Sequence, residues 1–346
     1  MTGSVRHAAD GRRAFSLVEL LVTMVIISIV ASLSAVGLAG IRTRTKVAKT
    51  RTTIRKLHEV VVPRSLEYLD RRVDDAVWSE FDYELDRSGL DGRDPRLKAG
   101  SPVLAAWKRL TQIRGMMVHE MPDQWIDVRR PAYPVDPSDS VPSNPKAVST
   151  PVIERYLRHV DALVTPADPS RNTPDKVLAT LGLSEASAET LYLQVALGSL
   201  DADALEPFRE DEIGDGDGDG AREFLDGFGR PIHFLRWAPG HARQAGLPVT
   251  DDPFDPYRLG KALGAADSSL LTPLIVSAGP DEQFSLRRDA SRSIEEQGAA
   301  RVAMQPGGLK FLPLPFDPFD PIEAGGAIPG NRGHLDNISN LGMGSP

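Results

Sequence analysis

Hydrophobic residues form one long uninterrupted run near the start of this chain and several short periodic stretches after it. Residues 20–41 contain 22 positions without a charged side chain. As a helix this run is about 33 Å long at about 1.5 Å per residue, which matches the hydrocarbon core of a bilayer. Apolar residues at helical spacing follow at Ile54, Leu57 and Val61. The pattern predicts one N-terminal helix over residues 15–62, whose first part spans a membrane.

Three-to-four spacing of apolar residues predicts further helices in the next part of the chain. Thr150-Pro151 and Thr173-Pro174 each have the form of an N-cap followed by proline at the first helical position. Ser184 is a candidate N-cap as well. The predicted helices cover residues 64–85, 103–118, 151–164, 174–181 and 184–200.

Apolar segments at residues 232–237 and 274–277 are too short for helices and end at turn residues, so they are predicted to be strands. The chain then divides into a mostly helical region at 63–205, a region with a small antiparallel sheet at 206–312, and a tail at 313–346. The tail is rich in Pro, Gly and Asn without periodicity and is expected to be disordered. The predicted fold class is α+β, with a long N-terminal helix followed by a globular head.

The start of the apolar run contains a specific pattern. Residues 12–22 read Arg-Arg-Ala-Phe-Ser-Leu-Val-Glu-Leu-Leu-Val. This segment resembles the class III signal of type IV prepilins and type II secretion pseudopilins. In that family a basic leader and a small residue precede Phe-Thr-Leu-x-Glu, which continues into a hydrophobic helix. The family usually has Gly where this chain has Ala14.

The resemblance implies a role for three residues. Residues 1–14 would be a leader that a prepilin peptidase removes after Ala14. Phe15 would become the N-methylated first residue of the mature protein. Glu19 would pair with the terminal amine of a neighbouring pilin or pseudopilin subunit during assembly. The cost of a carboxylate in lipid is consistent with such a role, since an opposed ammonium offsets much of that cost.

This segment has two alternative interpretations. A cleaved secretory signal has a shorter apolar region and does not place Glu inside it, while a plain membrane anchor does not require Glu19. The basic residues predict the opposite membrane orientation to the one that the signal implies, because more of them follow the apolar run than precede it. They are Arg42, Arg44, Lys46, Lys49, Arg51, Arg55 and Lys56. The positive-inside rule alone would place that side in the cytoplasm, whereas the signal places the head outside the inner membrane.

Composition narrows the functional classes. The net charge of −8 argues against general nucleic-acid binding, and the absence of cysteine excludes disulfides and thiolate metal sites. No zinc-protease, serine-hydrolase or phosphate-loop motif is present, so an enzyme is not expected. His233 lies near an acidic loop, and strand packing is the preferred explanation for it.

That acidic loop is a candidate metal site. Counted from Asp215, carboxylates occupy loop positions one, three, five, nine and twelve, and glycine occupies position six. The spacing matches the loop that wraps calcium in oxygen atoms. The predicted ligands are the side chains of Asp215, Asp217, Asp219, Glu223 and Asp226 with the main chain of Ala221. The alternative is a solvated acidic turn.

Two later segments resemble the major type II pseudopilin. Asp226-Gly-Phe-Gly-Arg-Pro231 is similar to its Asp-x-Trp-Gly-x-Pro turn, and Ser277-Ala-Gly-Pro-Asp281 is similar to its Ser-x-Gly-x-Asp strand end. The resemblance implies a pilin-like head outside the inner membrane and a fibre after assembly, either a type II secretion pseudopilus or a type IV pilus-like fibre. The expected partners are prepilin peptidase, other pilin subunits and inner-membrane lipid. The alternative is a membrane-anchored binding domain that never polymerises.

Overall fold

The structure is a computed structural model of the chain. It describes residues 17–72, 102–128, 132–133, 146–147, 150–181, 185–198, 203–238, 254, 273–283, 286 and 337–342. The chain divides into two compact units, Met1–Lys46 and Val47–Pro346. The described residues are mixed helix and short antiparallel strands, which confirms the predicted helices-plus-sheet composition.

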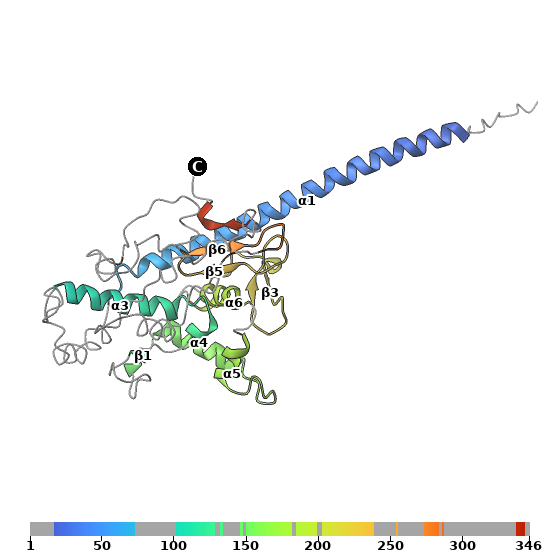
Figure 1. The fold of residues 1–346 in the computed structure, drawn as a ribbon. Coiled ribbons are helices and arrows are strands. Elements are labelled where there is room, and N and C mark those ends of the chain that lie inside the picture. Colours follow the sequence, from blue (N-terminus) through green and yellow to red (C-terminus); the bar gives the residue numbers. More distant parts are fainter. Residues whose placement is uncertain are drawn as a thin grey trace, which may run out of the picture. The chain divides into compact units, whose positions relative to one another are not determined.

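One helix, α1, runs continuously over Leu17–Glu67 with Pro63 inside it (Figure 1). The separate helix predicted over residues 64–85 is wrong at its start, because residues 64–67 are the last turn of α1 and residues 68–70 form a turn. Residues 73–85 lie outside the described part of the chain. Among the described residues, no helix is both long and apolar enough to cross a membrane. The structure therefore does not show the membrane span expected over residues 20–41.

The main core of the second unit forms on one face of α1. Its buried positions there recur every three or four residues, as helical geometry requires for a single face. They are Thr50, Thr53, Ile54, Leu57, Val61 and Ser65. Helix α3 (Pro102–Glu120) contributes Leu110, Ile113 and Met117 to the same core. The predicted helix at 103–118 is thus confirmed.

A three-stranded antiparallel sheet completes this core. It consists of β5 (His233–Leu235), β6 (Leu274–Ser277) and β7 (Ile338–Ser339), in the order β5-β6-β7. Phe234 is paired with Ile275. Both side chains are in one buried cluster with Ile54 and Leu57, and β5 and β6 lie beside α1 in Figure 1. The two predicted strands are confirmed, but β7 comes from the tail that was expected to be disordered.

Four further helical segments pack on one another, and the last of them in the chain contacts β5 and β4 (Glu223–Phe224). They are η4 (Trp125–Asp127), α4 (Pro151–Ala162), α5 (Pro174–Leu181) and α6 (Ala186–Leu193), the last continuing as the π-helical segment η5 (Gln194–Gly198). As predicted, Thr150 caps α4, its hydroxyl accepting a hydrogen bond from the backbone N–H of Ile153 at 3.4 Å. A second core lies among these helices. It contains Trp125, Tyr156, Val160, Val177, Leu181 and Leu193.

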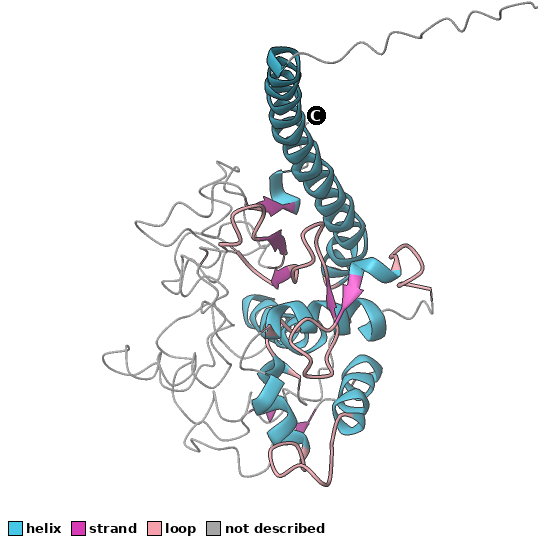
Figure 2. Cartoon of the chain, turned by 90° about the vertical axis from the view of Figure 1, so that its right-hand side faces the viewer, coloured by secondary structure: helices cyan, strands magenta, loops and turns pink. Residues whose placement is uncertain are grey.

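Two short hairpins and two single helical turns complete the described elements. β1 (Ala132–Tyr133) pairs with β2 (Lys146–Ala147), and β3 (Ile213–Gly214) pairs with β4 (Glu223–Phe224). The turn η6 (Glu210–Glu212) precedes β3, and η8 (Asn340–Gly342) follows β7. Figure 2 shows the strands as short segments among longer loops and helices. The acidic loop connects β3 to β4, directly beside α6.

Candidate functional site

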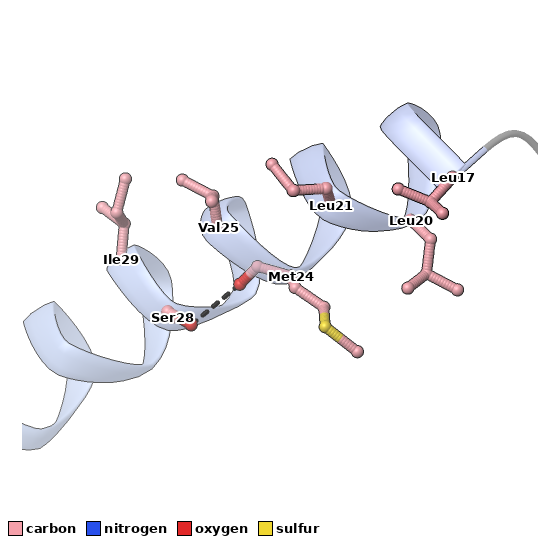
Figure 3. A pocket seen from close by; sticks show the side chains of 7 residues that line it. All are labelled: Leu17, Leu20, Leu21, Met24, Val25, Ser28 and Ile29. Carbon is pink, nitrogen blue, oxygen red and sulfur yellow. Dashed lines mark hydrogen bonds between the residues drawn. The ribbon is translucent and has the colours of Figure 1, made fainter.

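The first candidate region is the start of α1, which belongs to the first unit. Its large apolar side chains are exposed on every side of the helix, at positions 17, 18, 20–22, 24–27, 29 and 30. Figure 3 shows seven residues that line one shallow apolar surface there: Leu17, Leu20, Leu21, Met24, Val25, Ser28 and Ile29. A helix that is hydrophobic all round requires a surrounding of lipid or other apolar chains.

The few polar groups in this stretch bond to the helix itself. The hydroxyls of Thr23, Ser28 and Ser32 donate to the backbone carbonyls of Leu20, Met24 and Ile29 at 2.8, 2.8 and 2.9 Å. Such hydroxyls need no outside partner, which suits an apolar environment. Glu19 is the acidic residue of the first turn and is exposed. Ala14 and Phe15 lie outside the described residues.

In the second unit, α1 is joined to the segment before the acidic loop by ion pairs. The Lys49 ammonium lies 2.6 Å from the Asp211 carboxylate, and the Lys56 ammonium lies 2.7 Å from Glu212. Glu212 is buried and also accepts a hydrogen bond of 2.6 Å from the Thr53 hydroxyl. Two residues of the basic run therefore contact acids of the same chain.

The acidic loop is a tight turn held by its own carboxylates. Asp215 accepts hydrogen bonds from the backbone N–H groups of Gly218 at 2.7 Å and Gly220 at 3.1 Å. Gly220, at loop position six, has φ of 96°, a conformation that residues with a Cβ rarely adopt. The glycine predicted to allow the sharp turn is thus in the required conformation.

The carboxylates of this loop form two groups that share Asp217. Oxygens of Asp215, Asp217 and Asp219 lie within 4.8 Å of one another. Oxygens of Asp217, Glu223 and Glu189 do so as well. Glu189 comes from α6, 26 positions before Asp215, the first residue of the loop predicted from spacing, so sequence reasoning missed it.

Two of these carboxylates are buried with an oxygen that has no partner. Glu189 and Glu223 are 1% and 0% exposed. One oxygen of Glu189 accepts a hydrogen bond from the indole N–H of Trp125, and one oxygen of Glu223 accepts from the backbone N–H of Gly216 at 3.2 Å. Among the described residues, no group forms a hydrogen bond with the Oε1 atom of either one. Such an atom is costly to bury unless a cation or proton satisfies it.

The electrostatics agree with this geometry. Burial, together with the nearby aspartates, raises the pKa of Glu223 to about 7. Burial likewise raises the pKa of Glu189 to about 8, although the hydrogen bond from Trp125 acts in the opposite direction. The protein groups around these carboxylates thus leave their negative charge largely uncompensated.

Asp226 lies elsewhere, although its loop position suggested a ligand. Its Oδ1 accepts hydrogen bonds from the backbone N–H groups of Phe228 at 2.7 Å and Arg230 at 3.0 Å. Its Oδ2 accepts from the Ser277 hydroxyl at 2.6 Å. Asp226 is not a member of either carboxylate group. Its Oδ1 therefore closes the turn that follows β4, and its Oδ2 connects this turn to β6.

His233 is buried between α6 and the sheet. Its Nδ1 lies 2.9 Å from the Ser187 hydroxyl, and its Nε2 lies 3.2 Å from a Glu185 carboxylate oxygen. Both partners belong to the start of α6 or the residue before it. The contacts fix the strand against the helix, in agreement with the strand-packing explanation.

A buried ion cluster was not anticipated from the sequence. The Arg236 guanidinium lies 2.8 Å from Asp123 and 2.5 Å from Asp127, and all three side chains are buried. Burial raises the pKa of Asp127 to about 7, because the effect of burial outweighs the attraction of Arg236 and the nearby Asp123 adds to it. The predicted strand at residues 232–237 includes Arg236, but no local signal in the sequence identified the two acids that pair with it.

Comparison with known proteins identifies the first region. Residues 10–35 match the family model described as Prokaryotic N-terminal methylation motif. The chain therefore carries the prepilin-type signal, which confirms the resemblance seen around Ala14, Phe15 and Glu19. The signal implies a structural subunit rather than an enzyme. No curated protein and no solved structure matches the chain.

Proposed function

We propose that this protein is the precursor of a pilin-like or pseudopilin subunit that assembles into a type II secretion pseudopilus or a type IV pilus-like fibre. The supporting observation is the methylation motif at residues 10–35, which includes the start of α1, where the apolar side chains are exposed on all sides of the helix. A prepilin peptidase cleaves between Ala14 and Phe15, and the new terminal amine is methylated.

The start of α1 anchors the precursor in the inner membrane, with residues 47–346 on the outer side. The apolar residues exposed around the helix contact lipid before assembly and the same helix of neighbouring subunits in the fibre. The hydroxyls of Thr23, Ser28 and Ser32 bond to the helix backbone, so these three groups need no new partner in lipid or in the fibre.

Glu19 makes the assembled fibre more favourable than the single subunit in lipid. A single carboxylate within an apolar helix is costly in lipid, and an opposed ammonium offsets that cost when the two lie in a packed bundle. The mature chain has one such ammonium at Phe15, four positions before Glu19. A subunit that docks with its terminal amine on a neighbour's Glu19 therefore neutralises both charges.

The test is processing and assembly of the full chain in cells that contain a prepilin peptidase and a fibre machine. Mass spectrometry of the mature protein should find an N-methylated Phe15 as the first residue. A mature chain that keeps residues 1–14, or that is cut within residues 20–41, would contradict the proposal.

The variant Glu19→Ala separates a fibre subunit from an anchored domain that never polymerises. It should insert into the membrane and be cleaved as before, because removing a charge makes insertion easier. Its incorporation into sheared fibres should fall about tenfold or more, as expected for the loss of a buried charge pair. Glu59→Ala changes an exposed acid of the same helix and is the matched control. Normal incorporation of Glu19→Ala would favour the anchored domain.

A further inference from the structure

The carboxylates of Glu189 and Glu223 lie close to that of Asp217. One buried oxygen atom of each glutamate receives no hydrogen bond from the described residues. Three features occur together there. The oxygens of these residues lie within 4.8 Å of one another. Glu189 and Glu223 are almost completely buried. Their Oε1 atoms have no partner within the described part of the chain.

The remaining contacts hold these carboxylates in place for a ligand. The Trp125 indole fixes one oxygen of Glu189, and the Gly216 amide fixes one oxygen of Glu223. Partners of this kind orient the ligands of protein-bound metals. Asp219 is fixed in the same way, since it accepts a hydrogen bond from the Ala221 amide at 2.8 Å. The side chains are thus positioned before any cation arrives.

We propose that Glu189, Asp215, Asp217, Asp219 and Glu223 bind one calcium ion that joins helix α6 to the β3–β4 hairpin. Glu189 takes the place that loop spacing had given to Asp226. The donors are all carboxylate oxygens, which favours a hard cation over zinc or copper. They come from two separate segments with varied orientations, a geometry that calcium tolerates and the strictly octahedral magnesium ion does not.

The ion would connect the two cores of the second unit. On α6, Leu191 belongs to the core beneath the sheet, and Leu193 belongs to the core among the helices. Phe224, directly after Glu223, is buried in the first of these cores. An ion between Glu189 and Glu223 therefore fixes α6 against β4, and its effect does not depend on fibre assembly.

The first experiment measures the melting of the full chain, purified in detergent, with calcium chloride or with a chelator. Binding to the folded state alone stabilises it by about 2.7 kcal/mol at a hundredfold excess over the dissociation constant. For a domain of this size, calcium should raise the melting temperature by roughly 5 to 10 °C. Equal melting temperatures with calcium and with chelator would overturn the proposal, and an equal increase from magnesium would overturn the choice of calcium.

Terbium(III) replaces calcium to locate the ion. Trp125 donates its hydrogen bond to Glu189, so its indole lies beside the site. Excitation of tryptophan should produce terbium luminescence that excess calcium removes. Trp125→Phe should lose most of this luminescence and retain a calcium-dependent increase in melting temperature. Luminescence that is unchanged in Trp125→Phe would place the ion elsewhere and overturn the proposal.

Variants test the set of ligands. Glu189→Gln and Asp217→Asn should each weaken calcium binding about 10- to 100-fold, measured by calorimetry. In chelator both should melt no lower than the unmodified chain, because one of several repelling carboxylates is gone. Glu210→Gln changes an exposed acid just before the hairpin and should bind calcium normally. Normal binding by Glu189→Gln, together with lost binding by Asp226→Asn, would restore the ligand set expected from loop spacing and overturn this one.

Discussion

Glu223 and Asp226 are three positions apart in the sequence, and their carboxylates have different functions. Glu223 is buried with one oxygen unsatisfied. Asp226 is equally buried, but it accepts three hydrogen bonds, two of them from the backbone of its own turn. A satisfied buried carboxylate stabilises the fold, whereas an unsatisfied one needs a ligand. Hydrogen bonding therefore separates a structural acid from a candidate metal ligand.

Asp226→Ala should lower the free energy of unfolding by about 1 to 3 kcal/mol, since the amides of Phe228 and Arg230 would be left unpaired. Asp226→Asn should cost much less, because the amide oxygen can still accept both hydrogen bonds. Urea denaturation in the presence of chelator measures both values. A loss of stability in Asp226→Ala that occurs only when calcium is present would indicate that Asp226 is a ligand.

At the scale of elements, the β3–β4 hairpin and the turn before it are held from two sides. On one side, Glu212 of η6 contacts Thr53 and Lys56 of α1. On the other side, Glu189 of α6 approaches Glu223 of β4. The first connection is a direct ion pair with hydrogen bonds. The second joins carboxylates of like charge, so the two connections respond differently to pH and to cations.

The Glu212 connection should weaken in acid. Burial alone would raise the pKa of Glu212, but hydrogen bonds from Lys56, Thr53 and the Arg209 amide outweigh burial and hold it below its ordinary value of 4.5. A carboxyl whose pKa is lower in the folded state contributes stability above its unfolded pKa and loses it as the pH falls through the folded value.

Glu212→Gln should therefore be less stable than the unmodified chain at pH 7, by about 1.5 to 3 kcal/mol, as for a hydrogen bond to a charged group. The difference between the two proteins should shrink as the pH falls below about 4.5. Denaturation at a series of pH values measures it. A difference that stays constant from neutral to acidic pH would show that Glu212 stabilises the fold through packing and not through its charge.

Across the whole molecule, α1 has two parts with opposite surfaces. Over residues 17–30, in the first unit, the large apolar side chains are exposed on all sides of the helix. In the second unit, one face of α1, which includes Ile54, Leu57 and Val61, is buried with α3 and the sheet. Among the described residues, the core around α1, α3 and the sheet contains none from the first unit, so the two parts of the helix have different surroundings.

A chain that begins at Val47 should fold and remain soluble, since it keeps the whole buried face of α1. A chain that begins at Val62 lacks Ile54, Leu57 and Val61, each fully or almost fully buried. Losing such side chains removes about 1.5 to 3 kcal/mol each, which approaches the total stability of an ordinary domain. Circular dichroism melts and size-exclusion chromatography should show a cooperative monomer for the first and an unfolded or aggregated chain for the second. Similar melts for both would mean that α1 is not part of the core.

The sequence by itself determined the features that depend on neighbouring residues. The methylation motif, the helix at residues 102–120 and the cap at Thr150 each require side chains within one or two helical turns. Gly220 belongs to this group as well, because the turn of the acidic loop is set by its own backbone. These local preferences act before any tertiary contact forms, so pattern and spacing were sufficient to predict them.

Tertiary structure alone decided which distant residues meet. Spacing assigned Asp226 to the calcium loop, but the fold brings Ser277 to Asp226 and Glu189 to Glu223. The fold likewise brings Asp123 and Asp127 to Arg236. The strand β7 lies in a segment without periodicity and forms by pairing with the edge of β6. Burial and partners are set by packing between segments far apart in the chain, and no local pattern records that packing.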